Sequence, residues 1–239
     1  IVILSTNTWA LPMQKNLSAE QISHYRTEGY LVLENFVSRP WLDRLNAVTQ
    51  SFVDLSRKVL ISDKQFDVEP DHSADTPRLR RLNSPVDQHP DYWEFASSSE
   101  IVDLAESILG PDIKFHHGKL NFKYPQGGEE VKWHQDIQFF PHTNYNVFTI
   151  GCYLADTDMN NGPLAVMPSS HNEPLFDQYD ADGNWTGMLS DHDAATLDMD
   201  RVDYLTGPAG TLTIHNCRTL HFSPPSKSTA PRPLLLNCF

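Results

Sequence analysis

The chain has 239 residues, 39% of them hydrophobic and 21% charged, which is enough for one large domain with a substantial core. Its formal net charge of −13 argues against nucleic acid as a partner, because proteins that bind nucleic acid need a basic surface to displace counterions. No segment approaches the roughly 18 consecutive apolar residues of a membrane helix, and no secretory signal is recognisable, so we expect no membrane partner either.

The first predicted element is a helix, preceded by an extended arm at residues 1–16. Ser18 and Gln21 form a capping box at its start, and Gly29 is a residue type that commonly ends helices. The segment YLVLENF, residues 30–36, is then predicted to be a strand.

A long amphipathic helix is predicted over residues 38–60. Ser38 is its N-cap and Pro40 lies in its first turn. Apolar residues then recur at spacings of three and four, which defines one buried face: Leu42, Leu45, Val48, Phe52, Leu55 and Val59. With a further helix over residues 98–110, these elements form a helical N-terminal part at about residues 17–110.

Residues 62–95, between these helices, are polar and contain prolines, with RLRRLN at 78–83. The arginines in this run either form a solvated edge or contact an acidic group, and the charge pattern leaves both possibilities open.

From residue 113 onward, short apolar segments alternate with turns rich in glycine and proline. Strands are predicted at residues 119–124, 147–156, 163–168, 210–216 and 232–239. Many short strands with such turns are typical of a β-sandwich or barrel. The acidic segment 172–206 has no strand pattern, and its length predicts an insertion that acts as a lid.

The three cysteines, Cys152, Cys217 and Cys238, lie in apolar segments and show no CxxC spacing. Reduced cysteines in the core are the simplest interpretation, which predicts a reducing, cytoplasmic compartment.

The segment EEVKWHQDIQFFPH contains His134 and Asp136, two residues apart. An extended strand directs such residues to the same face, so an imidazole nitrogen and a carboxylate oxygen could point to one divalent metal. A buried aspartate needs such a partner. The alternative is a polar strand end that faces water, which is the commoner outcome for an isolated short motif.

A candidate third ligand lies in GTLTIHNCRTLHFSPP. The strand pattern places His215 on one face of a strand, whereas His221 is predicted beyond that strand in a polar turn. Ser223 follows two residues later, and Arg232 opens the last predicted strand. The His-x-Asp pair, a remote histidine and a nearby arginine are together more specific than any one of them.

The chemistry of Fe(II) explains this set. Two imidazoles and one carboxylate on one face of an octahedral ion leave three positions open, two for a 2-oxo acid and one for O2. The far carboxylate of 2-oxoglutarate needs a planar, permanently charged partner such as Arg232, and Ser223 can add a hydrogen bond. Zinc would also fit the three ligands, but a zinc hydrolase would have no use for Ser223 and Arg232.

These motifs resemble the phytanoyl-CoA dioxygenase family of Fe(II)- and 2-oxoglutarate-dependent oxygenases. The resemblance covers four segments: SAEQISHYRTEGYLVLENFVS, HHGKLNFKYPQGGEEVKWHQD, NNGPLAVMPSSH and HFSPPSKSTAPRP. Two positions depart from the family pattern, Ser169 for glycine in a turn and Thr211 for aspartate before a late strand, and the first is expected to alter only the turn.

The resemblance implies a mainly β protein with flanking helices. Its core, at about residues 111–239, would be a double-stranded β-helix (a cupin-like jelly roll) within one domain spanning residues 1–239. It implies that the metal ligands are His134, Asp136 and His221 and that Arg232, Ser223, Asn121 and Thr149 contact 2-oxoglutarate.

The implied reaction consumes O2, decarboxylates 2-oxoglutarate to succinate and CO2, and hydroxylates or desaturates a small molecule. Acyl-CoA, amino acids, osmolytes and secondary metabolites are all substrates of relatives. Halogenating relatives lack the carboxylate that Asp136 supplies, so oxygenation is expected. A non-catalytic metal-binding module and an oxygenase that does not use 2-oxoglutarate are the alternatives.

The remaining histidines are expected not to be ligands: His116, His117, His171 and His215, of which His215 lies beside the site. Phe139 and Phe140, with the lid, either line the substrate pocket or pack within the barrel.

Overall fold

The computed structural model describes residues 17–125 and 130–239. The predicted arm at residues 1–16 lies outside the described residues. Across the described part of the chain, no helix combines the length and apolar character needed to cross a bilayer.

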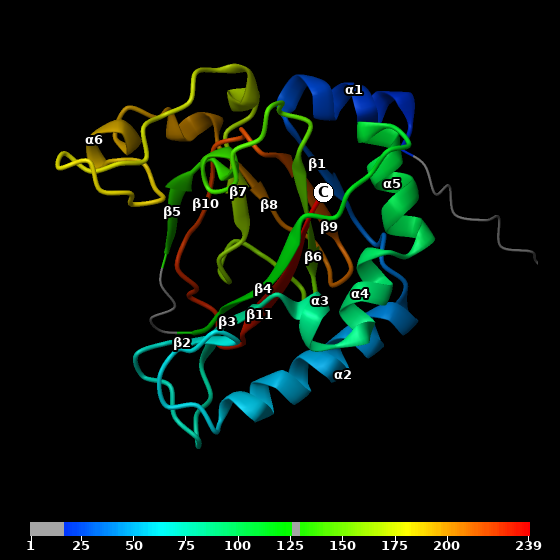
Figure 1. Cartoon of the computed structure of the whole chain (residues 1–239), viewed down its shortest axis with the longest axis vertical. Coiled ribbons are helices and arrows are strands. Elements are labelled where there is room, and N and C mark those ends of the chain that lie inside the picture. The colour runs from blue at the N-terminus through cyan, green and yellow to red at the C-terminus, as the bar shows by residue number, and fades with distance from the viewer. Residues whose placement is uncertain (1–16, 126–129) are drawn as a thin grey trace, which may run out of the picture.

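Two antiparallel sheets form the core (Figure 1). The large sheet has the order β1-β9-β6-β11-β4-β3-β2, and the small sheet the order β5-β10-β7-β8. The large sheet contains β1 (Tyr30–Leu33), β2 (Phe66–Val68), β3 (Leu79–Asn83), β4 (His117–Lys123), β6 (Phe148–Tyr153), β9 (Leu212–Asn216) and β11 (Arg232–Cys238). The small sheet contains β5 (Val131–His134), β7 (Leu164–Val166), β8 (Asp203–Leu205) and β10 (His221–Ser223). Many neighbouring strands are remote in sequence, such as β11 between β6 and β4 and β10 between β5 and β7, as the predicted jelly roll requires, and that prediction is confirmed.

The helices of the N-terminal part gather on one side of the molecule (Figure 1). They are α1 (Ala19–Glu28), α2 (Arg39–Ser56), α3 (Pro85–Gln88), α4 (Pro90–Ala96) and α5 (Ser99–Leu109). The predicted capping box of α1 is present, because the Ser18 hydroxyl accepts from the Gln21 amide at 3.1 Å and the Gln21 side chain accepts from the Ser18 amide at 2.8 Å. The second helix ends at Ser56, earlier than the predicted residue 60.

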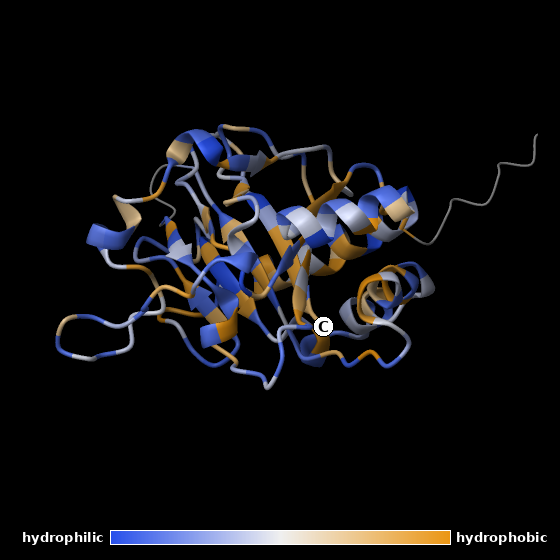
Figure 2. Ribbon diagram, turned by 90° about the horizontal axis from the view of Figure 1, so that it is seen from above, coloured by the Kyte–Doolittle hydropathy of each residue, from blue (hydrophilic) through white to orange (hydrophobic). Residues whose placement is uncertain are grey.

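The two faces of the large sheet differ in character, as the alternation of side chains along its strands requires. One face is apolar and packs against the helices, with Leu120, Ile150 and Ile214 in one cluster with Leu45 and Phe52. Figure 2 shows hydrophobic residues concentrated between the helices and the sheet. The opposite face turns toward the small sheet and carries the polar side chains Lys119, Asn121, Thr149, His215 and Arg232. The helical layer therefore leaves the inner face free for a site.

Residues 62–95 hold two strands that the sequence did not predict, β2 and β3. The RLRRLN segment forms β3 and pairs with β4, with Arg81 opposite Asn121 and Leu82 opposite Leu120. The interpretation as a solvated edge is therefore wrong for Arg81, whose side chain lines the interior cavity. Only Leu79 and Leu82 are apolar in this strand, and their spacing of three hides the two-residue period.

The predicted insertion at residues 172–206 does more than cover a pocket. Its Phe176, Leu189 and Leu197 pack with Trp133 and Phe222 on the outer side of the small sheet. It also contains α6 (Asp191–Ala194) and ends in β8, so the expectation of a strand-free segment is wrong at its C-terminal end. The part that reaches the interior cavity is the turn at residues 186–188.

Ser169 adopts a left-handed conformation with φ 64°, which explains why glycine is usual there. Its hydroxyl donates to the Glu28 carboxylate at 2.8 Å, and its amide donates to the Glu28 carbonyl at 2.8 Å. These bonds tie the turn to α1 and offset the backbone strain that a residue with a Cβ carries in this conformation.

Candidate functional site

Two histidines face each other across neighbouring strands of the small sheet. The register pairs His221 of β10 directly with His134 of β5, and their rings lie 4.0 Å apart between centroids. Gln135 is extended, with φ −126° and ψ 123°, so Asp136 returns to the side of His134 before a 3₁₀ turn begins. All three side chains are buried. The prediction that His221 lies in a polar turn is wrong, since it is a buried strand residue.

The hydrogen bonds of both imidazoles indicate which nitrogen carries the proton. His134 Nδ1 lies 2.8 Å from the Lys132 carbonyl, and His221 Nδ1 lies 2.9 Å from the Thr219 carbonyl. A carbonyl only accepts, so each Nδ1 must donate. Each Nε2 then has a lone pair directed at the site, which is the form in which histidine binds metals. Burial lowers the pKa of both imidazoles, which favours this neutral form.

The Asp136 carboxylate is held in place by one of its two oxygens. Oδ2 accepts from the Thr149 hydroxyl at 3.1 Å and lies 3.3 Å from His215 Nε2. Burial alone would raise the pKa of Asp136. The interaction with His221, the hydrogen bond from His215 and the charge of Lys119 nevertheless hold the pKa well below its usual range. Asp136 is therefore an anion whose second oxygen, Oδ1, is left for another partner.

Oδ1 faces the two histidine nitrogens. It lies 3.7 Å from His134 Nε2 and 3.8 Å from His221 Nε2. Three buried acceptors thus converge with no donor among them, and their burial is unfavourable in free energy unless they bind a cation. One ligand atom from each residue lies within 4.8 Å of the others. The donor set and its burial therefore fit a divalent transition metal, and two imidazoles with one carboxylate are the set typical of non-haem Fe(II).

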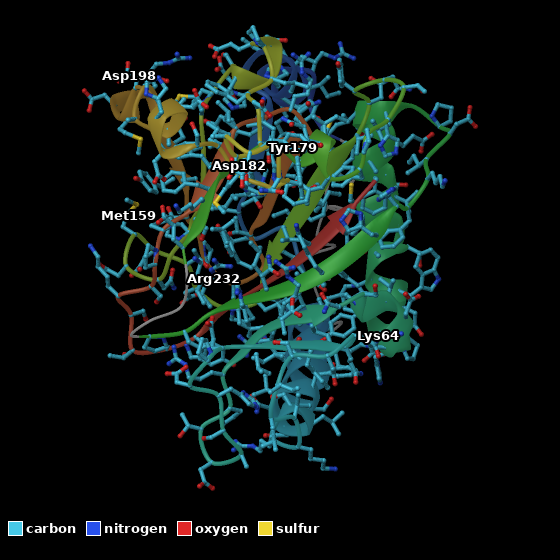
Figure 3. All side chains as sticks on the ribbon, turned by 60° about the vertical axis from the view of Figure 1, so that its left-hand side comes forward. Lys64, Met159, Tyr179, Asp182, Asp198 and Arg232 are labelled. Carbon is cyan, nitrogen blue, oxygen red and sulfur yellow. The ribbon has the colours of Figure 1, made fainter. Side chains whose placement is uncertain are left out.

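Arg232 carries a positive charge in the interior, at the start of β11 (Figure 3). It is only 2% exposed. One terminal nitrogen donates to the Gly162 carbonyl at 2.6 Å and to the Ser223 hydroxyl at 3.3 Å. Its Nε and its other terminal nitrogen are buried without a hydrogen-bond partner. A guanidinium with two nitrogens free to donate fits a bidentate carboxylate.

Lys123, the register partner of Arg232, is a second buried cation there. Its ammonium donates to the Ser223 carbonyl at 3.1 Å. Burial and the adjacent charge of Arg232 lower its pKa to about 7, although Glu130 and Glu69 partly offset this effect. Two neighbouring cations strengthen the preference of this end of the cavity for an anion.

One cavity of about 790 Å³ joins the three acceptors to Arg232. Phe139 and Phe140 both line it, as does the turn at residues 186–188. Phe139 packs edge-on against Trp185 of the insertion, with ring centroids 5.2 Å apart. The insertion therefore covers this part of the cavity through an aromatic contact.

All seven predicted site residues line this cavity: His134, Asp136, His221, Arg232, Ser223, Asn121 and Thr149. Two of them have partners that the sequence did not indicate. Asn121 accepts from Arg81 Nε at 2.9 Å, and Thr149 donates to Asp136. Sequence reasoning missed Lys119, Lys123 and Arg81, although the alternation of KLNFK places Lys119 and Lys123 on the face of Asn121.

The other histidines occupy different surroundings. His171 lies outside the cavity and contacts the Arg26 carbonyl at 3.1 Å. The Nδ1 atoms of His116 and His117 lie 2.6 Å apart and, with Cys238, form a second group of possible ligands. His215 has the position beside the site that the sequence indicates.

Comparison with known proteins shows the family and the fold of the chain. The family model "Phytanoyl-CoA dioxygenase (PhyH)" matches residues 25–234. A "Probable alpha-ketoglutarate-dependent hypophosphite dioxygenase" of Stutzerimonas stutzeri is 37% identical over 91% of this chain and 77% of that protein. An ectoine dioxygenase of Sphingopyxis alaskensis is 24% identical over 90% of this chain and 73% of its own length. The crystal structure of EctD from S. alaskensis with bound Fe superposes with a TM-score of 0.77 at 23% identity, over 93% of this chain and 76% of that one.

Proposed function

The chain belongs to the phytanoyl-CoA dioxygenase family and is an Fe(II)- and 2-oxoglutarate-dependent dioxygenase, and we propose that it transfers one oxygen atom of O2 to a small-molecule substrate. One observation carries this proposal. A buried set of three acceptors and a buried arginine with two unpaired nitrogens share a single cavity. The first fits the metal and the second the far carboxylate of the co-substrate.

We propose that His134, Asp136 and His221 bind Fe(II). When bound, the iron would supply activation of O2, with 2-oxoglutarate as the source of two electrons. The protein contributes the fixed tautomers of both histidines and a carboxylate whose orientation Thr149 and His215 maintain. Such outer contacts typically change metal affinity or activity by about 10–100-fold.

The far carboxylate of 2-oxoglutarate would bind to Arg232 and Ser223. The Ser223 hydroxyl donates to the Gly162 carbonyl at 2.9 Å, so it would exchange this acceptor for the carboxylate. Lys123 adds a nearby positive charge. Asn121, fixed by its hydrogen bond from Arg81, is available to contact the rest of the co-substrate. These residues orient the molecule before the substrate binds.

Each turnover consumes one molecule of O2. One oxygen atom enters succinate as CO2 leaves 2-oxoglutarate, and the other converts an X–H bond of the substrate into X–OH. A second, more specific candidate is hypophosphite, favoured by the relative of S. stutzeri at 37% identity. There the P–H bond takes the place of C–H, and the product is phosphite.

The test is product analysis with Fe(II), 2-oxoglutarate and ascorbate under ¹⁸O2 at high chloride. The panel contains hypophosphite, small carboxylic and amino acids, and an acyl-CoA. We expect succinate together with a product that gains one ¹⁸O atom, and no chlorinated product. A product that only loses two hydrogens would show desaturation in place of oxygen transfer. The reason is that Asp136 occupies the ligand position a halide would need. A product with the isotope pattern of chlorine would contradict the role of Asp136, and absence of succinate from every reaction would contradict the proposed function.

A pH effect is expected from Lys123. Its pKa is about 7 in the free protein, below its ordinary value, because burial and Arg232 disfavour the charge. A carboxylate at Arg232 would favour the charge and raise this pKa. At pH 8 the binding of 2-oxoglutarate should therefore take up a proton, and the affinity should decrease as the pH rises above about 7.

Calorimetry in two buffers of different ionisation enthalpy measures this uptake. Lys123→Met should bind 2-oxoglutarate more weakly and without proton uptake. Wild-type protein that binds 2-oxoglutarate with no proton uptake at pH 8 would show that the co-substrate does not raise the pKa of Lys123.

We place the protein in the cytoplasm, as the sequence predicts. Cys152, Cys217 and Cys238 are all free and buried, which a reducing compartment would preserve. The alternative of a non-catalytic module is disfavoured by the complete ligand set, and that of an oxygenase without 2-oxoglutarate by the unused nitrogens of Arg232.

A further inference from the structure

We propose that the substrate is a small anion and that Lys119 binds its charged group. This inference rests on the proposed function, since it concerns the same cavity. It names the class of substrate and a residue that no motif assigns.

Lys119 lies on the inner face of β4, with its side chain half-buried in the cavity. It pairs with Asn83 of β3 and Leu236 of β11. Lys123 is four residues further along the same strand, about 13 Å away at the usual rise per residue. The charge of Lys119 is therefore not at the Arg232 end of the cavity.

The position of Lys119 is instead close to the three candidate ligands. The next residue of β4 on this inner face is His117, which lies opposite Cys238 of β11, and Cys238 lies opposite Thr149 of β6. The Thr149 hydroxyl donates a hydrogen bond to Asp136. The charge of Lys119 contributes to the lowered pKa of Asp136, after the effects of burial, His221 and His215. A group bound to Lys119 would thus lie near the reacting centre.

The side chain of Lys119 has no hydrogen bond or ion pair with any residue within 17–125 or 130–239. By contrast, Lys132 at the same cavity pairs with Asp191 at 3.2 Å, and Lys123 donates to Ser223. An ammonium group that is partly removed from water and lacks a protein partner favours an anionic ligand.

The charges around the cavity point the same way. Its described lining has six cationic residues, Arg80, Arg81, Lys119, Lys123, Lys132 and Arg232, against three acidic ones, Glu69, Glu130 and Asp136. This is a net positive charge inside a protein whose formal net charge is −13. Arg81 and Lys132 have acidic partners outside this lining, Asp67 at 3.6 Å and Asp191 at 3.2 Å. A divalent iron and a dianionic co-substrate cancel each other, so neither uses the charge of Lys119, which has no acidic partner among the described residues.

Anaerobic titration of the Fe(II)- and 2-oxoglutarate-loaded protein tests this inference without turnover. The probes are hypophosphite, a short-chain carboxylate and the neutral amide of that carboxylate. We expect at least one anion to bind and the amide not to bind. Binding of hypophosphite alone identifies a phosphorus oxyanion as the substrate class, and binding of the carboxylate alone identifies a carboxylate.

Lys119→Met should weaken binding of that anion and raise its KM by about 10–100-fold, the range for one charged hydrogen bond. The KM for 2-oxoglutarate and the affinity for Fe(II) should stay within about twofold, on the same energy scale. Lys119→Arg should recover part of the loss, because it keeps the charge. Lys132→Met is the matched control, as it removes a lysine from the same cavity that already has an acidic partner.

Two outcomes would overturn the inference. One is anion binding that is equal in wild type and Lys119→Met, and the other is a matching rise in the KM for 2-oxoglutarate. Failure of the proposed function is distinguishable, because it would abolish succinate formation in wild type altogether. Succinate formation that only neutral compounds stimulate would leave the proposed function intact and contradict the anionic substrate.

Discussion

Asp136→Ala is expected to weaken Fe(II) binding by at least about 100-fold and to abolish activity. Contacts that merely orient metal ligands already contribute about 10–100-fold, and this change removes a ligand together with its charge. The Oδ1 atom of Asp136 lies within 4 Å of both histidine Nε2 atoms, so its loss removes one of the three converging ligand atoms. His221→Ala should have a similar effect, because His221 is the direct partner of His134 across the small sheet.

Anaerobic titration with Fe(II) in the presence of 2-oxoglutarate measures this effect. Wild type should develop a weak visible charge-transfer band from chelation by the 2-oxo acid, and both variants should lack it. Asp182→Ala and His192→Ala are controls, since both residues are exposed on the insertion. Circular dichroism checks that the variants are folded. An unchanged band in both site variants would place the iron elsewhere.

Arg232→Met is expected to raise the KM for 2-oxoglutarate by about 100-fold or more while Fe(II) affinity changes little. Hydrogen bonds to a charged group contribute about 1.5–3 kcal/mol each, and a fork of two supports this magnitude. Arg232 Nε and one terminal nitrogen are buried and unpaired, so these donors are available only to a ligand. Arg232→Lys should recover part of the loss, because a lysine keeps the charge but lacks the planar fork.

Initial rates at varied 2-oxoglutarate, together with Fe(II) titration, separate co-substrate binding from support of the fold. Arg201→Met is the control, since the side chain of this exposed arginine on the insertion contacts the Pro168 carbonyl and Glu173, away from the cavity. Equal losses of iron and 2-oxoglutarate affinity in the Arg232 variants would mean that Arg232 maintains the structure rather than binding the co-substrate.

The sequence predicted most of the fold where a periodic signal was long enough. The helix at α2 and the strands β4, β6, β9 and β11 each extend over at least five residues, and each was found within a few residues of its observed bounds. Among the missed strands, β2, β8 and β10 have three residues each, which is too short for a two-residue period to be visible. The other, β3, has five residues, but its two apolar residues are three apart. Of these strands, β10 is the one that carries a predicted metal ligand. Because β10 contains His221, the burial of His221 could not be inferred.

The sequence by itself determined which chemical groups the site contains. The residue types at His134, Asp136, His221 and Arg232 predict a metal ligand set and an anion-binding arginine, because two imidazoles with a carboxylate suit Fe(II) and a guanidinium offers a planar fork to a carboxylate.

Only the tertiary structure decided how these side chains are held and what else faces them. It pairs His221 with His134, anchors Asp136 through Thr149 and His215, and brings the charge of Lys119 near the same centre. The physical reason is that periodicity along a strand indicates which face a side chain occupies, whereas the register between strands remote in sequence sets which side chains meet.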